Sequence, residues 1–396
     1  MISRALLFLT LIFLLLSPSG FEATAQDYQI SLITCDPGDE LYSTFGHSAI
    51  RVLDKTSGTD LVYNYGTFDF NTPFFYVKFS RRTLDYQLAL TTFEQFLYEY
   101  NYFKRSVREQ VLDLSPKQTR EILQFLRINY QPENRKYRYD FFFDNCATRI
   151  RDMMQSVLDN SLEWKEPADA DQKSFRQLID EYVYPLPWSD LGIDLALGAV
   201  IDREAREHEK LFLPDYLEAA FARAEVVGDG PRRPLVKETH VIYDFPDREV
   251  AFSILNPYLI LWLVSIVVGI VTFLGFKRKK LYTSVDIVLF GALGILGIVI
   301  VYLWFFTEHS QTKMNWNLLW AFPLHLSVAF MSARRLNPIW MKRYLLFALI
   351  AADLGLIFWL TGIQSFHPAI LPLLLATILR SNFLYYHVDK WMLTKN

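Results

Sequence analysis

The last third of the chain, residues 251–396, is dominated by long apolar runs. Residues 257–275 and 287–306 contain no charged side chain. Each run is long enough to cross the ~30 Å hydrocarbon core of a bilayer as a helix, which rises ~1.5 Å per residue. Three further candidate spans are less uniform: 318–333 contains Pro323 and His325, 344–363 contains Asp353, and 368–388 contains Arg380. The pattern predicts an all-α transmembrane bundle of about five helices, occupying residues 251–396.

Basic residues in the short connecting loops predict how this bundle is oriented. Four consecutive basic residues, 277–280, follow the first predicted span, and Arg334, Arg335, Lys342 and Arg343 follow the third. The positive-inside rule places these loops in the cytoplasm. The chain before residue 257 is therefore expected on the outer side of the membrane.

The N-terminus agrees with this orientation. Arg4 precedes the apolar stretch 5–16, which is short for a span, and Ala23-Thr24-Ala25 offers small residues at a cleavage site. These features predict a signal peptide at residues 1–25, followed by an exported domain at residues 26–250. An uncleaved anchor is the alternative.

Composition and motifs exclude several functional classes. The net charge is only −3, and no basic stripe with interleaved aromatic residues suggests a nucleic-acid partner. The sequence has no Gly-rich phosphate loop, zinc-binding H-E-x-x-H motif or G-x-S-x-G nucleophile elbow. We therefore expect neither a cofactor nor a metal.

Alternating and helical patterns predict an α+β exported domain. Strands are expected at 28–34, 48–53 and 61–65, the last two as a hairpin, with a turn at 36–39. Helices are expected at 92–103, 115–128 and 150–158, with Ser115 as an N-cap. Residues 160–250 are expected to be mostly helix and loop.

Two positions in this domain carry the residue types of nucleophilic catalysis. Asn145-Cys146 stands where a loop enters a helix, whose N-terminal potential favours a thiolate. Gly46-His47-Ser48 stands where a turn enters a strand, and the histidine could accept the thiol proton. The pair predicts acyl-transfer chemistry. A Cys35–Cys146 disulfide, the usual pairing of two cysteines in an exported chain, would instead bury the nucleophile, and His47 would then be structural.

The predicted outer loops of the bundle contain further candidates. His309, Asn315 and Asn317 lie in one loop and His367 in the other, on the same side of the membrane as the exported domain. They either bind substrate in a lipid-facing cleft or cap helix ends beside an interfacial Trp316. Within the spans, His325 and Asp353 are functional candidates or interhelical hydrogen-bonding groups.

Several stretches resemble known families. A histidine followed later by an Asn-Cys at a helix start is similar to circularly permuted papain-like enzymes, including the relatives of lecithin:retinol acyltransferase. More closely, the chain resembles the Lnb-type lipoprotein N-acyltransferase family of Bacteroidetes over essentially its whole mature length. The stretches that carry this resemblance are 34–38, 45–52, 63–68, 144–150, 315–320 and 366–368.

The resemblance implies a permuted papain-like periplasmic domain on a multi-pass protein of the inner membrane. It implies transfer of an acyl chain from a phospholipid to the α-amine of a diacylated lipoprotein through a thioester on Cys146, with His47 as base. Asn64 or Asn145 is expected to orient the imidazole. The aromatic residues expected to line an acyl groove, or simply to pack a core, are Tyr65, Phe68, Phe70, Phe74, Phe75 and 141–143.

Two rival readings remain open at this point. The same Cys–His machinery could serve a membrane-anchored cysteine peptidase or amidase, although one anchor would suffice for that function. A non-enzymatic receptor or assembly factor with a structural disulfide is the other. Free thiols at Cys35 and Cys146 would exclude the disulfide on which that reading depends.

Overall fold

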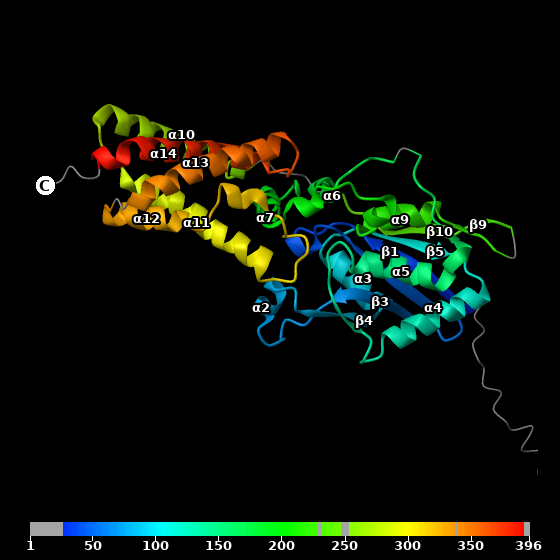
Figure 1. Ribbon diagram of the computed structural model, residues 1–396. Coiled ribbons are helices and arrows are strands. Elements are labelled where there is room, and N and C mark those ends of the chain that lie inside the picture. The colour runs from blue at the N-terminus through cyan, green and yellow to red at the C-terminus, as the bar shows by residue number, and fades with distance from the viewer. Residues whose placement is uncertain (1–26, 169, 229–230, 247–252, 337–338, 392–396) are drawn as a thin grey trace, which may run out of the picture.

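The computed structural model describes residues 27–168, 170–228, 231–246, 253–336 and 339–391. The predicted signal peptide, 1–25, and the predicted domain boundary at 250 lie outside these residues. An α+β domain stands beside a bundle of roughly parallel helices (Figure 1). This arrangement confirms the predicted fold class.

The exported domain is built on one antiparallel sheet with the strand order β10-β5-β1-β2-β3-β4-β6. Its strands are β1 (Tyr28–Cys35), β2 (His47–Asp54), β3 (Asp60–Thr67), β4 (Asp85–Thr92), β5 (Val107–Leu112), β6 (Lys136–Arg138) and β10 (Val236–Tyr243). The three predicted strands are confirmed. Strand β10 was missed, because residues 160–250 were expected to be helix and loop; its exposed, charged sequence forms a sheet edge. A small second sheet contains β7 (Leu162–Glu163), β8 (Glu225–Val226) and β9 (Arg233–Pro234).

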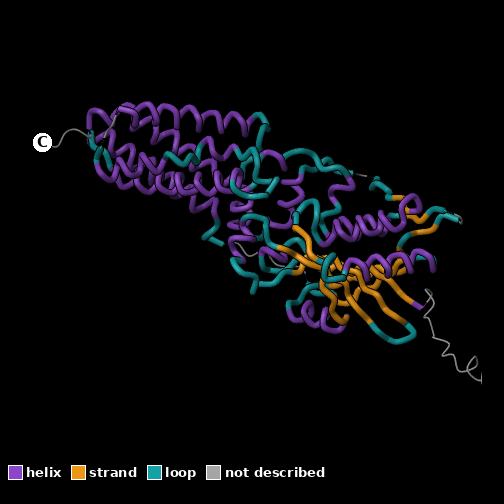
Figure 2. The backbone as a smooth tube through the Cα atoms, turned by 60° about the horizontal axis from the view of Figure 1, so that its bottom comes forward, coloured by secondary structure: helices purple, strands orange, loops and turns teal. Residues whose placement is uncertain are grey.

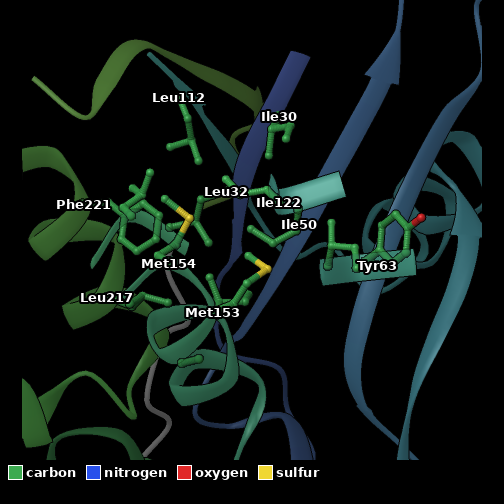
Figure 3. Close-up of a cluster of buried hydrophobic side chains, with 14 of the residues drawn as sticks. Ile30, Leu32, Ile50, Tyr63, Leu112, Ile122, Met153, Met154, Leu217 and Phe221 are labelled. Atoms are coloured by element: carbon green, nitrogen blue, oxygen red, sulfur yellow. The ribbon is translucent and has the colours of Figure 1, made fainter. Parts of the chain in front are cut away.

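Helices cover both faces of the large sheet, because successive strand residues point to opposite faces. One face packs on α4 (Pro116–Asn129), α5 (Cys146–Leu158) and α9 (Pro214–Arg223), and the other on α3 (Phe93–Tyr102). Figure 3 shows Ile30, Leu32 and Ile50 of the sheet meeting Ile122 of α4, Met153 of α5 and Phe221 of α9.

The helix predictions around this sheet hold, with one change of boundary. Ser115 caps α4 in a capping box with Gln118, as its position predicts. Helix α5 begins at Cys146, four residues before the predicted start. The remaining helices of this domain are α2 (Phe75–Ser80), α6 (Phe175–Val183), α7 (Pro187–Ala196) and α8 (Glu207–Lys210). The helix that begins at the cysteine follows the central strands along the chain.

The bundle contains five helices among the described residues (Figure 2). They are α10 (Pro257–Arg278), α11 (Thr283–Phe305), α12 (His325–Arg334), α13 (Ile339–Leu360) and α14 (Leu371–Trp391). Four segments are long and apolar enough to cross a membrane: Pro257–Arg278, Thr283–Phe305, Ile339–Leu360 and Pro368–Lys390. The fifth helix, α12, has only 10 residues and is not among these four segments.

The predicted span 318–333 is not one continuous helix. A 3₁₀ turn, Trp316–Leu319, is followed by Pro323 and then by the 10 residues of α12. The whole segment lies along α11: the Trp316 and Trp304 rings are 6.1 Å apart, and the His325 and Phe290 rings 5.3 Å. Irregular backbone is tolerated at membrane depth when neighbouring helices bury it. Gly297 of α11 makes this possible, because a Cβ there would lie 2.4 Å from the Ala321 carbonyl oxygen.

Two polar side chains of the predicted spans, Arg380 and His325, have hydrogen-bond partners inside the bundle. Arg380, which interrupts the last predicted span, is completely buried, and its Nε lies 2.5 Å from Asp286 Oδ1. His325 bonds the Trp320 carbonyl oxygen and the Tyr344 hydroxyl, each at 3.1 Å. Of the two polar candidates within the spans, His325 therefore makes an interhelical hydrogen bond with Tyr344 of α13. The other, Asp353, lies on an exposed face of α13.

Candidate active site

Cys146 is the first residue of α5, and its position depends on the cap before it. Asn145 Oδ1 accepts from Thr148 N at 2.9 Å, while Thr148 Oγ1 accepts from Asn145 N at 2.7 Å. Asn145 Nδ2 also donates to the carbonyl oxygens of Phe141 and Phe212, both at 2.8 Å. These bonds hold the sulfur at the positive end of the helix, where a thiolate is stabilised.

His47 is the first residue of strand β2, which packs against α5. Gly46 precedes it with φ of 75°, and a Cβ on Gly46 would lie 2.8 Å from the Cys35 carbonyl oxygen. Only glycine fits this turn without a shift. The His47 Nε2 atom lies 2.6 Å from Asn64 Oδ1 on β3. Asn64, and not Asn145, therefore contacts the imidazole, since the polar atoms of Asn145 are engaged in capping.

The two central side chains interact directly. Burial disfavours a thiolate, but the His47 side chain and the backbone N–H groups of Ser48 and Ala147 outweigh it and lower the pKa of Cys146. Burial likewise disfavours an imidazolium, but Cys146 and the hydrogen bond with Asn64 raise the pKa of His47. Since Nε2 faces the Asn64 oxygen, Nδ1 is the nitrogen left to exchange a proton with sulfur. The arrangement favours a thiolate–imidazolium pair, which is an activated nucleophile.

Gly66 leaves room beside the sulfur. It sits at an irregularity in the β3–β4 pairing with φ of 89°. A Cβ there would lie 3.8 Å from Cys146 Cβ, 3.9 Å from the Tyr139 ring and 4.0 Å from the Tyr137 hydroxyl. That Tyr137 hydroxyl is buried and has no hydrogen-bond partner in the part of the chain that the structure describes. It is a donor available close to the reacting sulfur.

A cavity of about 530 Å³ contains both Cys146 and His47. Its walls are mainly apolar and come from the sheet, the loop before α5, helix α7 and the loop 306–315 of the bundle. The size is within the range of ~300–1,000 Å³ that is usual for small-molecule sites. His309 and Gln311 line it from the membrane domain.

Asp140 joins this membrane loop to the loop before α5. Gln311 Nε2 donates to Asp140 Oδ1 at 2.8 Å, and Arg82 Nη2 lies 2.7 Å from Asp140 Oδ2. The same carboxylate accepts from the backbone N–H groups of Phe142 and Phe143, at 3.0 and 3.1 Å. The bundle therefore helps to shape the cavity, and both Asp140 and Gln311 were missed because nothing local marks them.

The four candidates in the outer loops take different places. His309 lines the cavity; burial and the nearby Arg82 charge lower its pKa, and its ring bonds backbone groups at Ser80 and Phe79. The other three lie outside the cavity walls. Asn315 Nδ2 donates to the Leu195 and Ala196 carbonyl oxygens at 2.8 and 3.1 Å, Asn317 Nδ2 to the Asp194 carbonyl oxygen at 3.3 Å, and His367 Nε2 lies 3.2 Å from Asp190 Oδ2. These four contacts, made by three residues, join the bundle to α7.

The aromatic residues proposed for an acyl groove also divide. Phe68, Phe141 and Phe142 line the cavity. Tyr65 is in the core of the sheet domain, and its hydroxyl bonds Asn129 at 2.9 Å. The remaining ones, Phe70, Phe74, Phe75 and Phe143, lie outside the cavity walls.

Arg105 is a further wall residue that sequence patterns did not reveal. Its side chain is buried, its Nε donates to the Asp36 carbonyl oxygen at 2.7 Å, and its Nη2 has no hydrogen-bond partner among the described residues. A buried guanidinium without a carboxylate beside it is costly. An anionic group of a ligand in the cavity could neutralise it.

Cys35 is a separate, free thiol. The structure shows Cys35 and Cys146 both unbonded, so the disulfide considered above is absent. Cys35 is completely buried, and burial raises the pKa of its thiol well above the usual range. It is therefore protonated and inert, in contrast to Cys146.

One group of three carboxylates in the described residues has the spacing of a metal site. Oxygens of Asp180, Asp190 and Asp194 lie within 4.8 Å of one another, between α6 and α7. Two of the three already have cationic or hydrogen-bonding partners: Asp194 pairs with Arg176 at 2.5 Å, and Asp190 with His367 at 3.2 Å. Burial and the charges of Asp194 and Asp190 raise the pKa of Asp180 to about 7. This cluster belongs to the contact between the domains.

Comparison with protein families gave two matches that together cover most of the chain. Residues 22–181 match the Lnb N-terminal periplasmic domain, and residues 249–390 match the Lnb transmembrane domain. The first match includes Cys146, His47 and Asn64, and the second includes His309 and Gln311. A search of curated proteins and a search of solved structures each returned no match.

Proposed function

Because this chain belongs to the Lnb family, a family of membrane proteins with a periplasmic N-terminal domain, we propose that it is a lipoprotein N-acyltransferase of the inner membrane. It would move an acyl chain from a phospholipid to the α-amine of a lipoprotein's N-terminal diacylglyceryl-cysteine. Membership of the family indicates a role in lipoprotein processing. The observation that carries the specific reaction is a mainly apolar cavity, lined by both domains, in which Cys146 and His47 lie together; the lowered pKa of Cys146 and the raised pKa of His47 favour the thiolate and the imidazolium.

The first half-reaction forms a thioester. The Cys146 thiolate attacks the carbonyl carbon of a phospholipid acyl ester, and the bond from that carbon to the glycerol oxygen breaks. The departing alkoxide takes the proton that His47 holds as imidazolium. A lysophospholipid leaves, and His47 is then neutral.

The second half-reaction forms the amide. The lipoprotein amine attacks the thioester carbonyl carbon, neutral His47 removes a proton from the attacking nitrogen, and the Cys146 thiolate departs. This step regenerates the starting pair without any other reactant. Water must stay away from the thioester, and the apolar lining of the cavity by residues such as Phe68, Phe141 and Phe142 supports that requirement.

Both tetrahedral intermediates carry a negative oxygen that needs donors. The N–H of Cys146 lies in the first turn of α5, where N–H groups have no acceptor within the helix. The unpartnered Tyr137 hydroxyl is the second donor that we assign to this oxyanion hole. Arg105, with its unpaired Nη2, would bind the phosphate of the donor lipid.

The direct test is mass spectrometry of lipoprotein N-termini from cells that carry one variant as the only copy. We expect triacylated N-termini with the wild type and diacylated ones with Cys146→Ser and His47→Ala. Cys35→Ala is the matched control, because it removes the other thiol from a buried position without leaving a hydroxyl unsatisfied. It should retain triacylation.

Expression of each variant in the membrane must be verified by immunoblotting. Equal triacylation in all four strains would eliminate N-acylation by this pair. Diacylated N-termini even with the wild type would eliminate the reaction itself and favour the peptidase or amidase.

A further inference from the structure

An unusual group of exposed aromatic and apolar side chains occupies α2 and the loop before it. We call this surface the aromatic wedge; it consists of Phe70, Phe74, Tyr76, Val77 and Phe79, which are 71, 80, 81, 53 and 53% exposed. Contiguous exposed apolar side chains of this kind mark an interaction site. In Figure 1, α2 projects from the sheet domain beside the end of α11.

Hydrogen bonds hold the aromatic wedge at a defined depth. Ser80 Oγ lies 3.1 Å from the Tyr302 hydroxyl, and Tyr302 belongs to the last turn of the apolar span Thr283–Phe305. Just beyond it, Glu308 N donates to the Arg81 carbonyl oxygen at 3.1 Å, and Arg82 Nη1 to the Glu308 carbonyl oxygen at 3.1 Å. Helix α2 is therefore level with the outer end of a membrane span.

That level is the interface between the hydrocarbon core and the headgroups, where aromatic side chains are enriched. The end of α11 continues the same kind of surface, because Phe305 and Phe306 are also exposed. Phe74 occupies the left-handed region with φ of 58°, a conformation that is costly for a bulky residue. Its ring is nevertheless 80% exposed, so packing within this chain does not account for the strained conformation.

The inner end of the aromatic wedge reaches the catalytic cavity. Phe79 lines that cavity, together with Phe68 from the same segment and with Cys146. The two exposed rings of Phe74 and Tyr76 lie only three to five residues away along α2 and its N-cap. Phe79 thus belongs both to the exposed aromatic wedge and to the wall of the cavity that contains Cys146.

From this geometry we propose that the aromatic wedge inserts into the outer leaflet and guides an acyl chain of the donor phospholipid from the bilayer into the Cys146 cavity. The part about the acyl chain rests on the proposed function, whereas insertion into the leaflet does not. The occupant of this surface is the bilayer itself, since the surface continues the lipid-facing end of α11.

Insertion can be tested without activity. In the full chain with Cys146→Ser, Tyr76→Cys is labelled with an environment-sensitive NBD fluorophore, and the protein is reconstituted into phosphatidylethanolamine–phosphatidylglycerol vesicles. Some vesicles contain lipid with a doxyl quencher near the headgroup. Lys117→Cys is the matched control, since Lys117 is 79% exposed at the opposite end of the sheet domain. We expect at least threefold quenching at position 76 and almost none at 117; equal quenching at the two positions overturns insertion.

Delivery of the acyl chain is tested with a charge. Tyr76→Glu is compared with Tyr98→Glu, which adds the same charge at a tyrosine that is 72% exposed on α3. Acyl transfer from bilayer phospholipid should fall at least fivefold in the first variant and remain within twofold of the wild type in the second. Acylation of Cys146 by water-soluble p-nitrophenyl butyrate should be unchanged in both.

The outcomes separate the two proposals. The guiding role is overturned if Tyr76→Glu and Tyr98→Glu lose transfer from phospholipid to the same extent. It is also overturned if Tyr76→Glu loses acylation by the soluble ester as strongly as it loses transfer from phospholipid. If the wild type transfers no acyl chain from phospholipid, the proposed function fails, while the quenching experiment still decides whether the aromatic wedge enters the membrane.

Discussion

The Nε2 atom of His47 lies 2.6 Å from Asn64 Oδ1, on the adjacent strand. The amide oxygen accepts, so it holds a proton on Nε2 and turns Nδ1 toward Cys146. Asn64 touches the base and not the reacting atoms, which makes it a positioning residue.

Asn64→Ala should lower kcat by about 10- to 100-fold, a part of the ~100- to 10,000-fold that general acid–base catalysis contributes. The pH profile distinguishes positioning from folding, because the Asn64 hydrogen bond raises the pKa of His47. Asn64→Ala should therefore move the basic limb of the profile to lower pH, and Asn64→Asp should move it to higher pH. Identical limbs in all three proteins would leave Asn64 with only a structural role.

The reactivity of the two thiols should differ with pH. At neutral pH, iodoacetamide should alkylate Cys146 rapidly and Cys35 hardly at all, because the pKa of the first is lowered and that of the second is raised. In His47→Ala the cationic partner is gone and burial remains, so the midpoint of Cys146 alkylation should rise beyond the ordinary thiol pKa of about 8.5. Peptide mass spectrometry after a timed reaction measures both sites, with Cys35→Ala to verify the assignment. An unshifted midpoint in His47→Ala would contradict the pair.

Gly66→Val should reduce both stability and activity. Its φ of 89° is strained for a valine, and the side chain would extend toward Cys146 and Tyr139. Gly58→Val is the control, since Gly58 has φ of 73° with nothing within 4 Å of its Cβ position. Both variants should lose about 1–3 kcal/mol of unfolding free energy, measured by thermal denaturation in detergent. Only Gly66→Val should also slow the acylation of Cys146; equal activity in the two variants would show that Gly66 is not needed to keep the site open.

Arg105→Gln should weaken binding of the acyl donor. Loss of a charge-assisted bond to phosphate costs about 1.5–3 kcal/mol, or roughly a 10- to 150-fold rise in KM for phospholipid. Arg105→Lys keeps the charge and should show a smaller rise. An uncharged p-nitrophenyl ester, which has no phosphate, should be used equally well by all three proteins. A matching rise in KM for that ester would indicate general damage to the cavity.

Asp180→Asn should stabilise the protein above neutral pH. The pKa of Asp180 in the folded protein is about 7, against an ordinary value of 3.8, so the folded state binds this proton more tightly than the unfolded state. The stabilisation of the folded state by this bound proton is complete below pH 3.8 and is lost as the pH rises through 7. The variant should thus match the wild type at pH 4 and gain on the order of 1 kcal/mol at pH 8, since solvent screens part of the effect. Thermal unfolding at both pH values measures this, with the exposed Asp171→Asn as a control that should show no such gain.

The local sequence determined much of the architecture, because its signals act over a few residues. Uncharged runs such as 257–275 must be helical in a bilayer, where backbone groups cannot bond water. Alternation marks β1, and Ser115 and Asn145 each cap a helix through groups three residues away. The segment 316–334 is not the continuous helix that its apolar run predicts, because Pro323 interrupts it. The non-helical backbone there is covered by α11. Strand β10 escaped detection because an edge strand with charged residues lacks an alternating apolar face.

The candidate site depended far more on the tertiary structure. Sequence patterns could nominate Cys146 and His47 by residue type, but their interaction depends on the fold, which brings the interior strands β2 and β3 and the start of α5 together at residues 47, 64 and 146. Asp140 and Gln311 are 171 positions apart in the chain, and no local signal marks either. Likewise, the buried Nη2 of Arg105 and the buried hydroxyl of Tyr137, which have no hydrogen-bond partner among the described residues, can be recognised only in the folded protein. Only folding determines which polar groups lose water and which neighbours replace it, and that balance sets the chemistry of this cavity.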